Sequence, residues 1–242
     1  MSQLIALLQK DARVVYRDGF LAFLPFYAVV LALVGRYAVP WVPVADFGVY
    51  LAPAMVLMGA LLLGNVLGFA LIEEREQGTW LLLRVLPVEP PMIFLYFCAV
   101  GSVFSFAMGL IVALAYGYPV ADLPTFFLMM AVSSLSAPIV MLVLGVMAAN
   151  KIEGMAVTKI FNLVTMVPAV VFVAPMPWQL AAAWCPWYWM YLGLLRAYTR
   201  DPGALSAAHW PNLPLGLIVT ASLVLALGSI VVLARLYVRR AA

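Results

Sequence analysis

The sequence predicts an all-α integral membrane protein, with six transmembrane helices in one domain that covers residues 1–242. Of the 242 residues, 67% are hydrophobic and 10% are charged, whereas soluble domains average about 45–50% and about 25%. The mean hydropathy is +1.11. A soluble domain of this length cannot bury so much apolar surface. The net charge of +3 is too small for capture of a nucleic acid. A soluble enzyme, a disordered chain and a nucleic-acid binder are therefore excluded.

Long uncharged runs give the positions of the spans. A spanning helix needs about 20 apolar residues, while a barrel strand needs about 10 residues of alternating polarity. The runs here are continuous, so the spans are helices. The fifth run is the shortest and carries Asn162 and Thr165. The six predicted spans are about 20–39, 49–72, 92–117, 124–149, 160–177 and 213–234.

Lysine and arginine predict the orientation. With the N-terminus inside, ten of these residues lie on the inner side and three on the outer side. The ten are Lys10, Arg13, Arg17, Arg75, Arg84, Lys151, Lys159, Arg235, Arg239 and Arg240, and the three are Arg36, Arg196 and Arg200. This inside excess predicts that both termini are cytoplasmic.

One further segment, residues 178–199, is long and apolar enough to compete as a span. If it crossed fully, the tally of lysine and arginine would weaken to nine on the inner side and four on the outer side. Pro186 also interrupts the run and removes a backbone donor in mid-helix. We interpret it as a helical outer element before the last span, either re-entrant or peripheral, within an aromatic connection over 178–212. Its aromatic residues are either an ordinary interfacial belt or an outer gate. The candidate gate residues are Trp184, Pro186, Trp187, Tyr188 and Trp189.

Residues 1–18 precede the first span, and their apolar and basic residues fall on different faces of a helix. Leu4, Ile5 and Leu8 share one face, while Lys10 and Arg17 lie on another. The pattern predicts an amphipathic helix on the inner membrane surface.

Several kinds of site are missing from the sequence. Away from their ends, the spans contain no Asp, Glu, Lys or His, which argues against a proton-driven transporter and weakens a sodium-driven carrier. His209 is the single histidine, so we expect no metal site. No nucleophile elbow or phosphate-binding loop with its lysine occurs. We expect that the chain is not an enzyme, and that any ATP is bound by another chain.

The inner loop between spans two and three, residues 73–91, carries the clearest motif. Three glutamates sit where a helix leaves the membrane, and Gly78 offers a break in the backbone. Thr79 can cap a short helix from Trp80 to Leu86, which Pro87 ends. The result is a rigid elbow with acidic residues toward the cytoplasm, by which a soluble partner can push on spans two and three.

The pattern E-x-E-x-G-T from Glu74, followed by leucines and Leu86-Pro87, resembles the type-2 permeases of ATP-binding-cassette exporters. The resemblance covers most of the chain and includes the stretch from Cys185 to Arg196, which is similar to the segment before the family's sixth span. Residues 150–154, N-K-I-E-G, are similar to those of a subgroup of bacterial drug-export permeases. One departure is that Glu89 and the following prolines stand where the family often has a basic residue.

The resemblance implies a half-transporter in the bacterial inner membrane. Two permease chains, like or unlike, would each dock on a cytosolic ATP-binding subunit that holds the ATP and magnesium. The implied coupling residues are Glu73, Glu74, Arg75, Glu76, Gly78, Thr79 and Pro87. The candidate path residues are polar positions at membrane depth, namely Asn65, Ser133, Asn162 and Thr165. In the family, spans two and five face the centre, which favours Asn65, Asn162 and Thr165 among them. Their alternative role is hydrogen bonding between helices.

The absence of buried charge predicts an apolar or amphipathic cargo. Three alternatives remain open at this point. The chain is a haem, polysaccharide or lipid exporter permease of the same superfamily, a sodium-driven carrier, or an intramembrane enzyme that modifies lipids. The acidic cluster of the inner loop motivates the last of these, although no metal set or nucleophile accompanies it.

Overall fold

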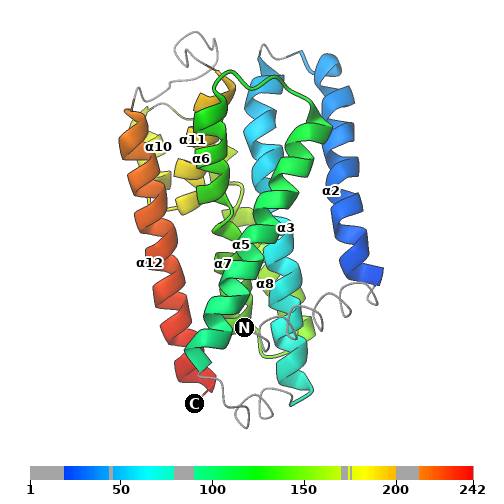
Figure 1. Ribbon diagram of the computed structural model, residues 1–242, viewed down its shortest axis with the longest axis vertical. Coiled ribbons are helices and arrows are strands. Elements are labelled where there is room, and N and C mark those ends of the chain that lie inside the picture. Colours follow the sequence, from blue (N-terminus) through cyan, green and yellow to red (C-terminus); the bar gives the residue numbers. More distant parts are fainter. Residues whose placement is uncertain are drawn as a thin grey trace.

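The computed structural model describes residues 19–43, 46–78, 90–169, 174, 176–199 and 213–241, and these residues form a bundle of helices (Figure 1). The helices of a full turn or more are α2 (Gly19–Ala38), α3 (Phe47–Glu76), α5 (Pro90–Tyr116), α6 (Leu123–Ser133), α7 (Ser136–Met147), α8 (Lys151–Val164), α10 (Met176–Gln179), α11 (Pro186–Tyr198) and α12 (Leu215–Ala241). Three 3-10 turns, η1 (Val39–Trp41), η2 (Val167–Ala169) and η3 (Leu180–Ala182), join them. No strand occurs in these ranges. The predicted surface helix of residues 1–18 lies outside them.

Four helical stretches are long and apolar enough to cross a membrane. They are Phe47–Glu76, Leu95–Tyr116, Leu123–Met147 and Leu215–Arg239, and a shorter apolar helix covers Phe26–Trp41. These correspond to the predicted spans two, three, four, six and one. The all-helical membrane class is therefore confirmed, and the ends of span two differ from the prediction by only a few residues.

The fifth predicted span differs from the structure. Residues 160–177 are not one helix, because α8 ends at Val164 and is followed by the short turns η2, α10 and η3 before α11 begins. Pro168, Pro177 and Pro186 lie along this stretch, and proline removes a backbone donor and disfavours helix at the residue before it. Only the end of α8 falls in the predicted fifth span, whereas α11 lies in the segment 178–199 that was predicted as a helical outer element.

The two ends of the bundle are named here by the residues of α3. The Asp46 end is where α3 begins, and the Glu76 end is where it stops. In Figure 1, α8 lies in the half near the Glu76 end, and α11 lies in the half near the Asp46 end. α12 runs from the Asp46 end to the Glu76 end (Figure 1).

α3 is the central helix and packs against α2, α5, α7, α8 and α11. Glycine allows its closest approach to α7: a Cβ added at Gly64 would lie 2.7 Å from the carbonyl oxygen of Ala137. Such small residues let backbones approach closely in membrane bundles. At the Asp46 end, Tyr191 of α11 donates to the carbonyl oxygen of Tyr50 at 2.8 Å. α3 is therefore fixed to neighbours along its whole length.

The fourth crossing is broken midway, between α6 and α7. The hydroxyl of Ser134 donates to the carbonyl oxygen of Ala131 at 2.7 Å, and the Ser134 amide donates to the carbonyl oxygen of Met130 at 3.0 Å. These bonds satisfy polar groups that a break in a helix leaves without regular partners, which apolar surroundings require. At its start, α6 is capped by Asp122, whose carboxylate accepts from the Thr125 amide at 3.3 Å and from its hydroxyl at 2.7 Å.

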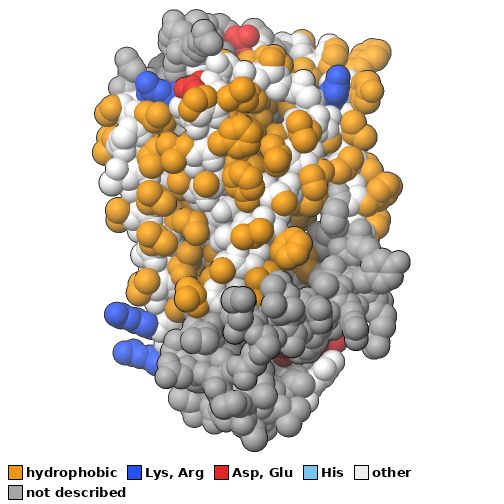
Figure 2. Space-filling view, in the orientation of Figure 1, with side chains coloured by type: hydrophobic (Ala, Val, Ile, Leu, Met, Phe, Trp, Pro, Cys, Tyr) orange, Lys and Arg blue, Asp and Glu red, His pale blue; other side chains and the backbone are white. Residues whose placement is uncertain are grey.

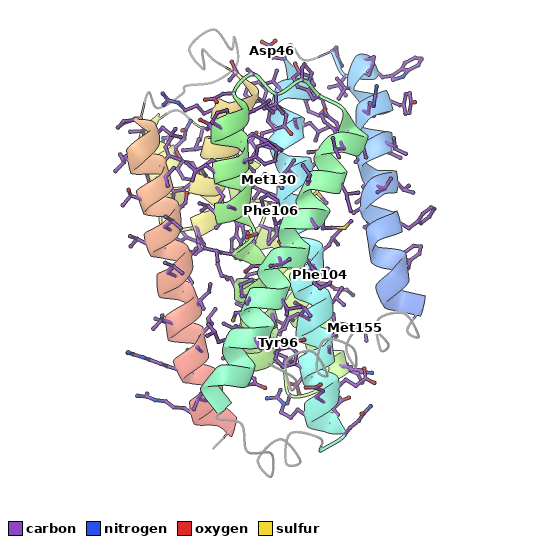
Figure 3. The ribbon with its side chains drawn as sticks, in the orientation of Figure 1. Asp46, Tyr96, Phe104, Phe106, Met130 and Met155 are labelled. Carbon is purple, nitrogen blue, oxygen red and sulfur yellow. The ribbon has the colours of Figure 1, made fainter. Side chains whose placement is uncertain are left out.

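The surface agrees with a membrane setting. In Figure 2, hydrophobic side chains cover the middle of the visible face, and the charged side chains lie near its two ends. Figure 3 shows Asp46 at one end and Met155 toward the other, with Phe104, Phe106 and Met130 between them. Phe104 is 56% exposed, and such apolar exposure over a wide band is suited to lipid rather than water.

Candidate coupling site and transport path

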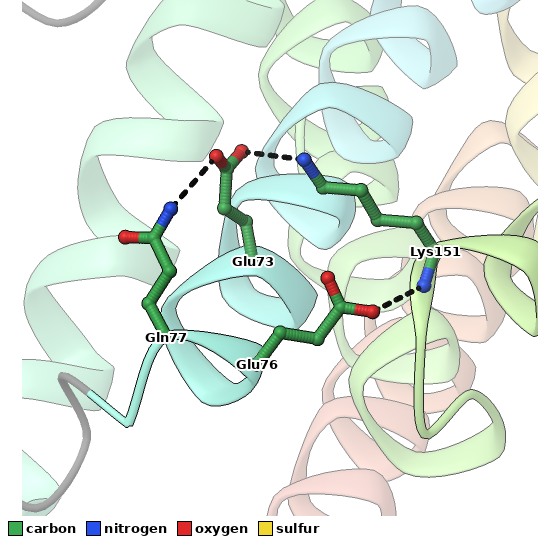
Figure 4. A network of polar contacts seen from close by, with 4 residues as sticks. All are labelled: Glu73, Glu76, Gln77 and Lys151. Carbon is green, nitrogen blue, oxygen red and sulfur yellow. Dashed lines mark hydrogen bonds and ion pairs between the residues drawn. The ribbon is translucent and has the colours of Figure 1, made fainter.

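The acidic end of α3 binds the start of α8. A carboxylate oxygen of Glu73 lies 3.2 Å from the Lys151 Nζ, and the Lys151 amide donates to Glu76 Oε1 at 2.9 Å (Figure 4). Gln77 Nε2 also donates to Glu73 Oε1 at 3.0 Å. Two of the predicted coupling glutamates, Glu73 and Glu76, thus also bind the start of α8 within the chain.

Arg75 binds the end of α7 from the same turn of α3. Its guanidinium donates to the carbonyl oxygen of Gly145 at 3.3 Å and to that of Ala148. The last carbonyls of a helix have no partner within the helix and carry partial negative charge, so a cation there is favourable. We call Glu73, Arg75, Glu76 and Lys151 the α3–α8 clamp, because together they hold α3 against the α7–α8 connection.

The segment N-K-I-E-G at the start of α8 builds its side of the clamp. Asn150 Oδ1 accepts from the Glu153 amide at 2.9 Å, and a Glu153 carboxylate oxygen accepts from the Ala149 amide at 2.7 Å. This reciprocal arrangement resembles a capping box. A Cβ at Gly154 would lie 2.9 Å from Ile72 Cδ1, so glycine permits the close approach of α8 to α3. These contacts build the helix start that carries Lys151.

Gly78 ends α3 as the sequence predicts. Its φ is +69°, a left-handed conformation that glycine adopts without strain. Its amide donates to the carbonyl oxygen of Arg75 at 3.1 Å. Glu74 is half-buried one turn earlier. Thr79, the predicted helix from Trp80 to Leu86, and Pro87 lie outside the described residues.

Two of the four candidate path residues have buried polar atoms without a hydrogen-bond partner among the described residues. These atoms are Asn65 Oδ1, in the middle of α3, and Ser133 Oγ, at the end of α6. An unpaired buried polar atom is costly and calls for a functional explanation. Asn162 is exposed on α8, and the Thr165 hydroxyl donates to its carbonyl oxygen at 2.7 Å.

The candidate gate residues lie at the start of α11. Trp187 is buried, its Nε1 donates to Ser136 Oγ at 3.1 Å, and its ring meets that of Phe161 edge-on at a centroid distance of 5.2 Å. Pro186 is the first residue of α11. The structure therefore places this part of the segment where the α6–α7 break, the end of α8 and the start of α11 meet.

The other aromatic members differ in exposure. Tyr188 is buried and donates to Gln179 Oε1 at 3.3 Å, and the Trp189 indole donates to the carbonyl oxygen of Ala183 at 2.7 Å. Trp184 is 64% exposed. Only part of the predicted gate thus faces outward, while its centre packs inside the bundle.

A cavity of about 630 Å³ opens at the Asp46 end. Its lining is Val120, Ala121, Asp122, Leu123, Pro124 and Arg196. The Arg196 guanidinium also donates to the carbonyl oxygen of Leu213 at 2.6 Å, which ties α11 to the start of α12. No group of three or more His, Cys, Asp or Glu side chains that could hold a metal ion occurs in the part of the chain that the structure describes.

Sequence reasoning did not place Lys151, Asn150 or Glu153 in the coupling site. The signal was present, because an asparagine followed three residues later by glutamate predicts a helix start, and the lysine between them is complementary to the acidic end of span two. Which charged residues pair depends on how helices distant in sequence pack, and that packing cannot be read from one sequence.

Comparison with known proteins gives one family. A family model described as "Fluoroquinolones export permease protein Rv2686c-like" matches residues 11–228, which is most of the chain. No curated protein matches the chain. The matched range includes every described helix up to the middle of α12.

Proposed function

Because this chain belongs to the Rv2686c-like family of fluoroquinolones export permease proteins, we propose that it forms the substrate path of an ATP-driven drug exporter. The family agrees with the resemblance to permeases of ATP-binding-cassette exporters that the inner loop carries. The match over residues 11–228 is the observation on which this proposal rests. The chain itself is a multi-pass membrane protein with several apolar helices.

The proposed cargo is an amphipathic aromatic drug of the fluoroquinolone class. Such a molecule combines a flat apolar ring system with a few polar groups. The bundle offers matching chemistry in its aromatic junction at Trp187 and Phe161. It also offers unpaired polar atoms on Asn65 and Ser133. We propose that cargo contacts these residues as it passes.

The proposed energy source is a separate cytosolic ATPase. The loop that follows Gly78 would dock on that subunit, which would hold the ATP and magnesium, so the permease would not be an enzyme. Two permease chains would pair around the path. The Glu76 end would face the cytoplasm of a bacterial cell, with both termini on that side, in agreement with the excess of basic residues there.

Drug accumulation and co-purification test this proposal. The tagged chain, purified from its own host in mild detergent, should bring down an ATPase with a phosphate-binding loop. Cells that express both chains should accumulate less of a fluoroquinolone than cells with the permease and an ATPase whose phosphate-loop lysine is replaced. Equal accumulation in the two strains, or drug movement by the purified chain without ATP, would contradict the proposal.

A further inference from the structure

The contacts of the α3–α8 clamp are better suited to fixing position than to adding stability. The side chains of Lys151 and Glu73 are 47% and 43% exposed, and exposed ion pairs contribute only about 0.2–1 kcal/mol. The clamp is nevertheless specific. It combines three kinds of contact. The Lys151 side chain pairs with Glu73, the Lys151 amide donates to Glu76, and the Arg75 guanidinium donates to two carbonyl oxygens at the end of α7. These bonds hold the last turn of α3 to the connection between α7 and α8.

α8 contacts its neighbours at both ends and also midway, where Val157 packs against the core. It has 14 residues, so it is about 21 Å long, and in the described residues it packs on α3 and α7. Its first turn carries Lys151 and Gly154, and its last turns carry Phe161 beneath Trp187. Ile152, Met155, Ile160 and Leu163 are exposed along its outer side. One short helix thus connects the clamp to the junction.

The junction at the far end of α8 lies beside the break between α6 and α7. Trp187 touches Phe161 of α8 and donates to Ser136, the first residue of α7. Ser133, whose buried Oγ has no hydrogen-bond partner among the described residues, ends α6 beside this break. Broken helices in transporters occur where a path must open and close.

From these contacts we propose that Lys151 and Arg75 are positioning residues that transmit movement from the cytosolic loop to the Trp187–Phe161 junction through α8. This inference rests on the proposed function and names the helices through which the movement passes. The last turn of α3, the end of α7 and α8 move as one unit when the loop after Gly78 is displaced. The far end of that unit then separates Phe161 from Trp187 and exposes Ser133 to the path.

A charge-swap series in the complete exporter tests the route. Lys151→Glu places like charges against Glu73 and Glu76, and we expect it to lower the drug exported per ATP hydrolysed by about tenfold, the size of an ordinary coupling between sites. ATPase association should persist. The double variant Glu73→Lys/Lys151→Glu should restore most of the ratio. Lys159→Glu, the same charge change at an exposed position of α8, is the matched control and should leave the ratio unchanged.

A distance measurement distinguishes loss of transmitted movement from loss of folding in the variant. Spin labels at Gln77 and Met155 report α3 against α8, and labels at Met155 and Trp184 report α8 against the segment before α11, in a background without Cys98 and Cys185. We expect the first distance to stay constant between nucleotide-free and ATP-bound exporter, while the second changes. In Lys151→Glu the first distance should broaden and the second should no longer follow ATP.

Two results would overturn the inference while leaving the proposed function intact. One is ATP-dependent export whose ratio to hydrolysis is the same in Lys151→Glu and wild type. The other is a Gln77–Met155 distance that changes with nucleotide as much as the second distance does. If the wild-type chain binds no ATPase and no distance responds to ATP, the proposed function and the inference fail together.

Discussion

The indole of Trp187 donates a hydrogen bond to the hydroxyl of Ser136 at 3.1 Å, so the first turn of α11 is tied to the first residue of α7. The Ser136 hydroxyl also lies 3.4 Å from the Met190 sulfur, toward which it donates. Three chain segments that are distant in sequence, counting Phe161 of α8, thus meet around one side chain.

Trp187→Phe should destabilise the purified protein by about 1 kcal/mol, because Ser136 loses a donor while most ring packing remains. Thermal unfolding in detergent measures this. Trp184→Phe is the control, since Trp184 is 64% exposed and surface changes stay within about 0.5 kcal/mol. Equal losses in both variants would show that the Ser136 bond contributes nothing measurable.

Gly64→Ala should destabilise the bundle by about 1–3 kcal/mol, because the added methyl overpacks the contact of α3 with α7. The new Cβ would lie 2.7 Å from the Ala137 carbonyl oxygen and 2.7 Å from Val140 Cβ. Gly228→Ala in α12 is the matched control, since a Cβ there meets nothing within 4 Å. Unfolding midpoints in detergent give the comparison, and an unchanged midpoint for Gly64→Ala would contradict the close packing.

Asn150→Ala and Asp122→Ala each remove an N-cap and should each lower stability by about 1 kcal/mol. Asn150 caps α8 and Asp122 caps α6. Only Asn150→Ala should also reduce drug export per ATP, because it loosens the helix start that presents Lys151. Hydrogen exchange at α8 and α6, together with transport by the complete exporter, distinguishes the two. A similar export defect in both variants would attribute the effect to stability alone.

Single cysteines at Trp41 and Gln77 should react with a membrane-impermeant maleimide from opposite sides. Both positions are exposed, and they belong to the Asp46 end and the Glu76 end. In intact cells Trp41→Cys should be labelled, whereas Gln77→Cys should be labelled only in inverted vesicles. Labelling of Gln77→Cys in intact cells would reverse the proposed orientation. The native Cys98 and Cys185 are replaced in this background, so each variant carries a single thiol.

Hydropathy predicted the long apolar crossings, because insertion depends on summed apolar content. The predicted span 49–72 lies within α3, Phe47–Glu76, and the span 124–149 overlaps Leu123–Met147. Hydropathy could not place the interruption at Ser134 or the end of α8 at Val164. Those breaks depend on proline and on local bonds such as that from Ser134 to Ala131, which a sum over residues does not represent.

The candidate site was predicted unevenly for a similar reason. The loop motif indicated Glu73, Glu76 and Gly78, and the positive φ of Gly78 confirms the predicted break. The partner of Glu73 is Lys151, and that pairing arises only when α3 and α8 pack side by side. Composition likewise marked Asn65 and Ser133 as polar, but their lack of partners among the described residues emerges only from the packed bundle.

The break between α6 and α7, the end of α8 and the start of α11 meet around Trp187, so these four helices form two layers. The layer at the Asp46 end joins α6 to α11, where a Cβ added at Gly193 would overlap Met129, and the layer at the Glu76 end joins α7 to α8. The backbone hydrogen bonds across the α6–α7 break are irregular, because the Leu135 amide donates to the carbonyl oxygen of Val132 and the Ala137 amide to that of Ser134. Because an irregular step is a point at which a helix bends easily, the two layers can tilt against each other by repacking side chains around Trp187.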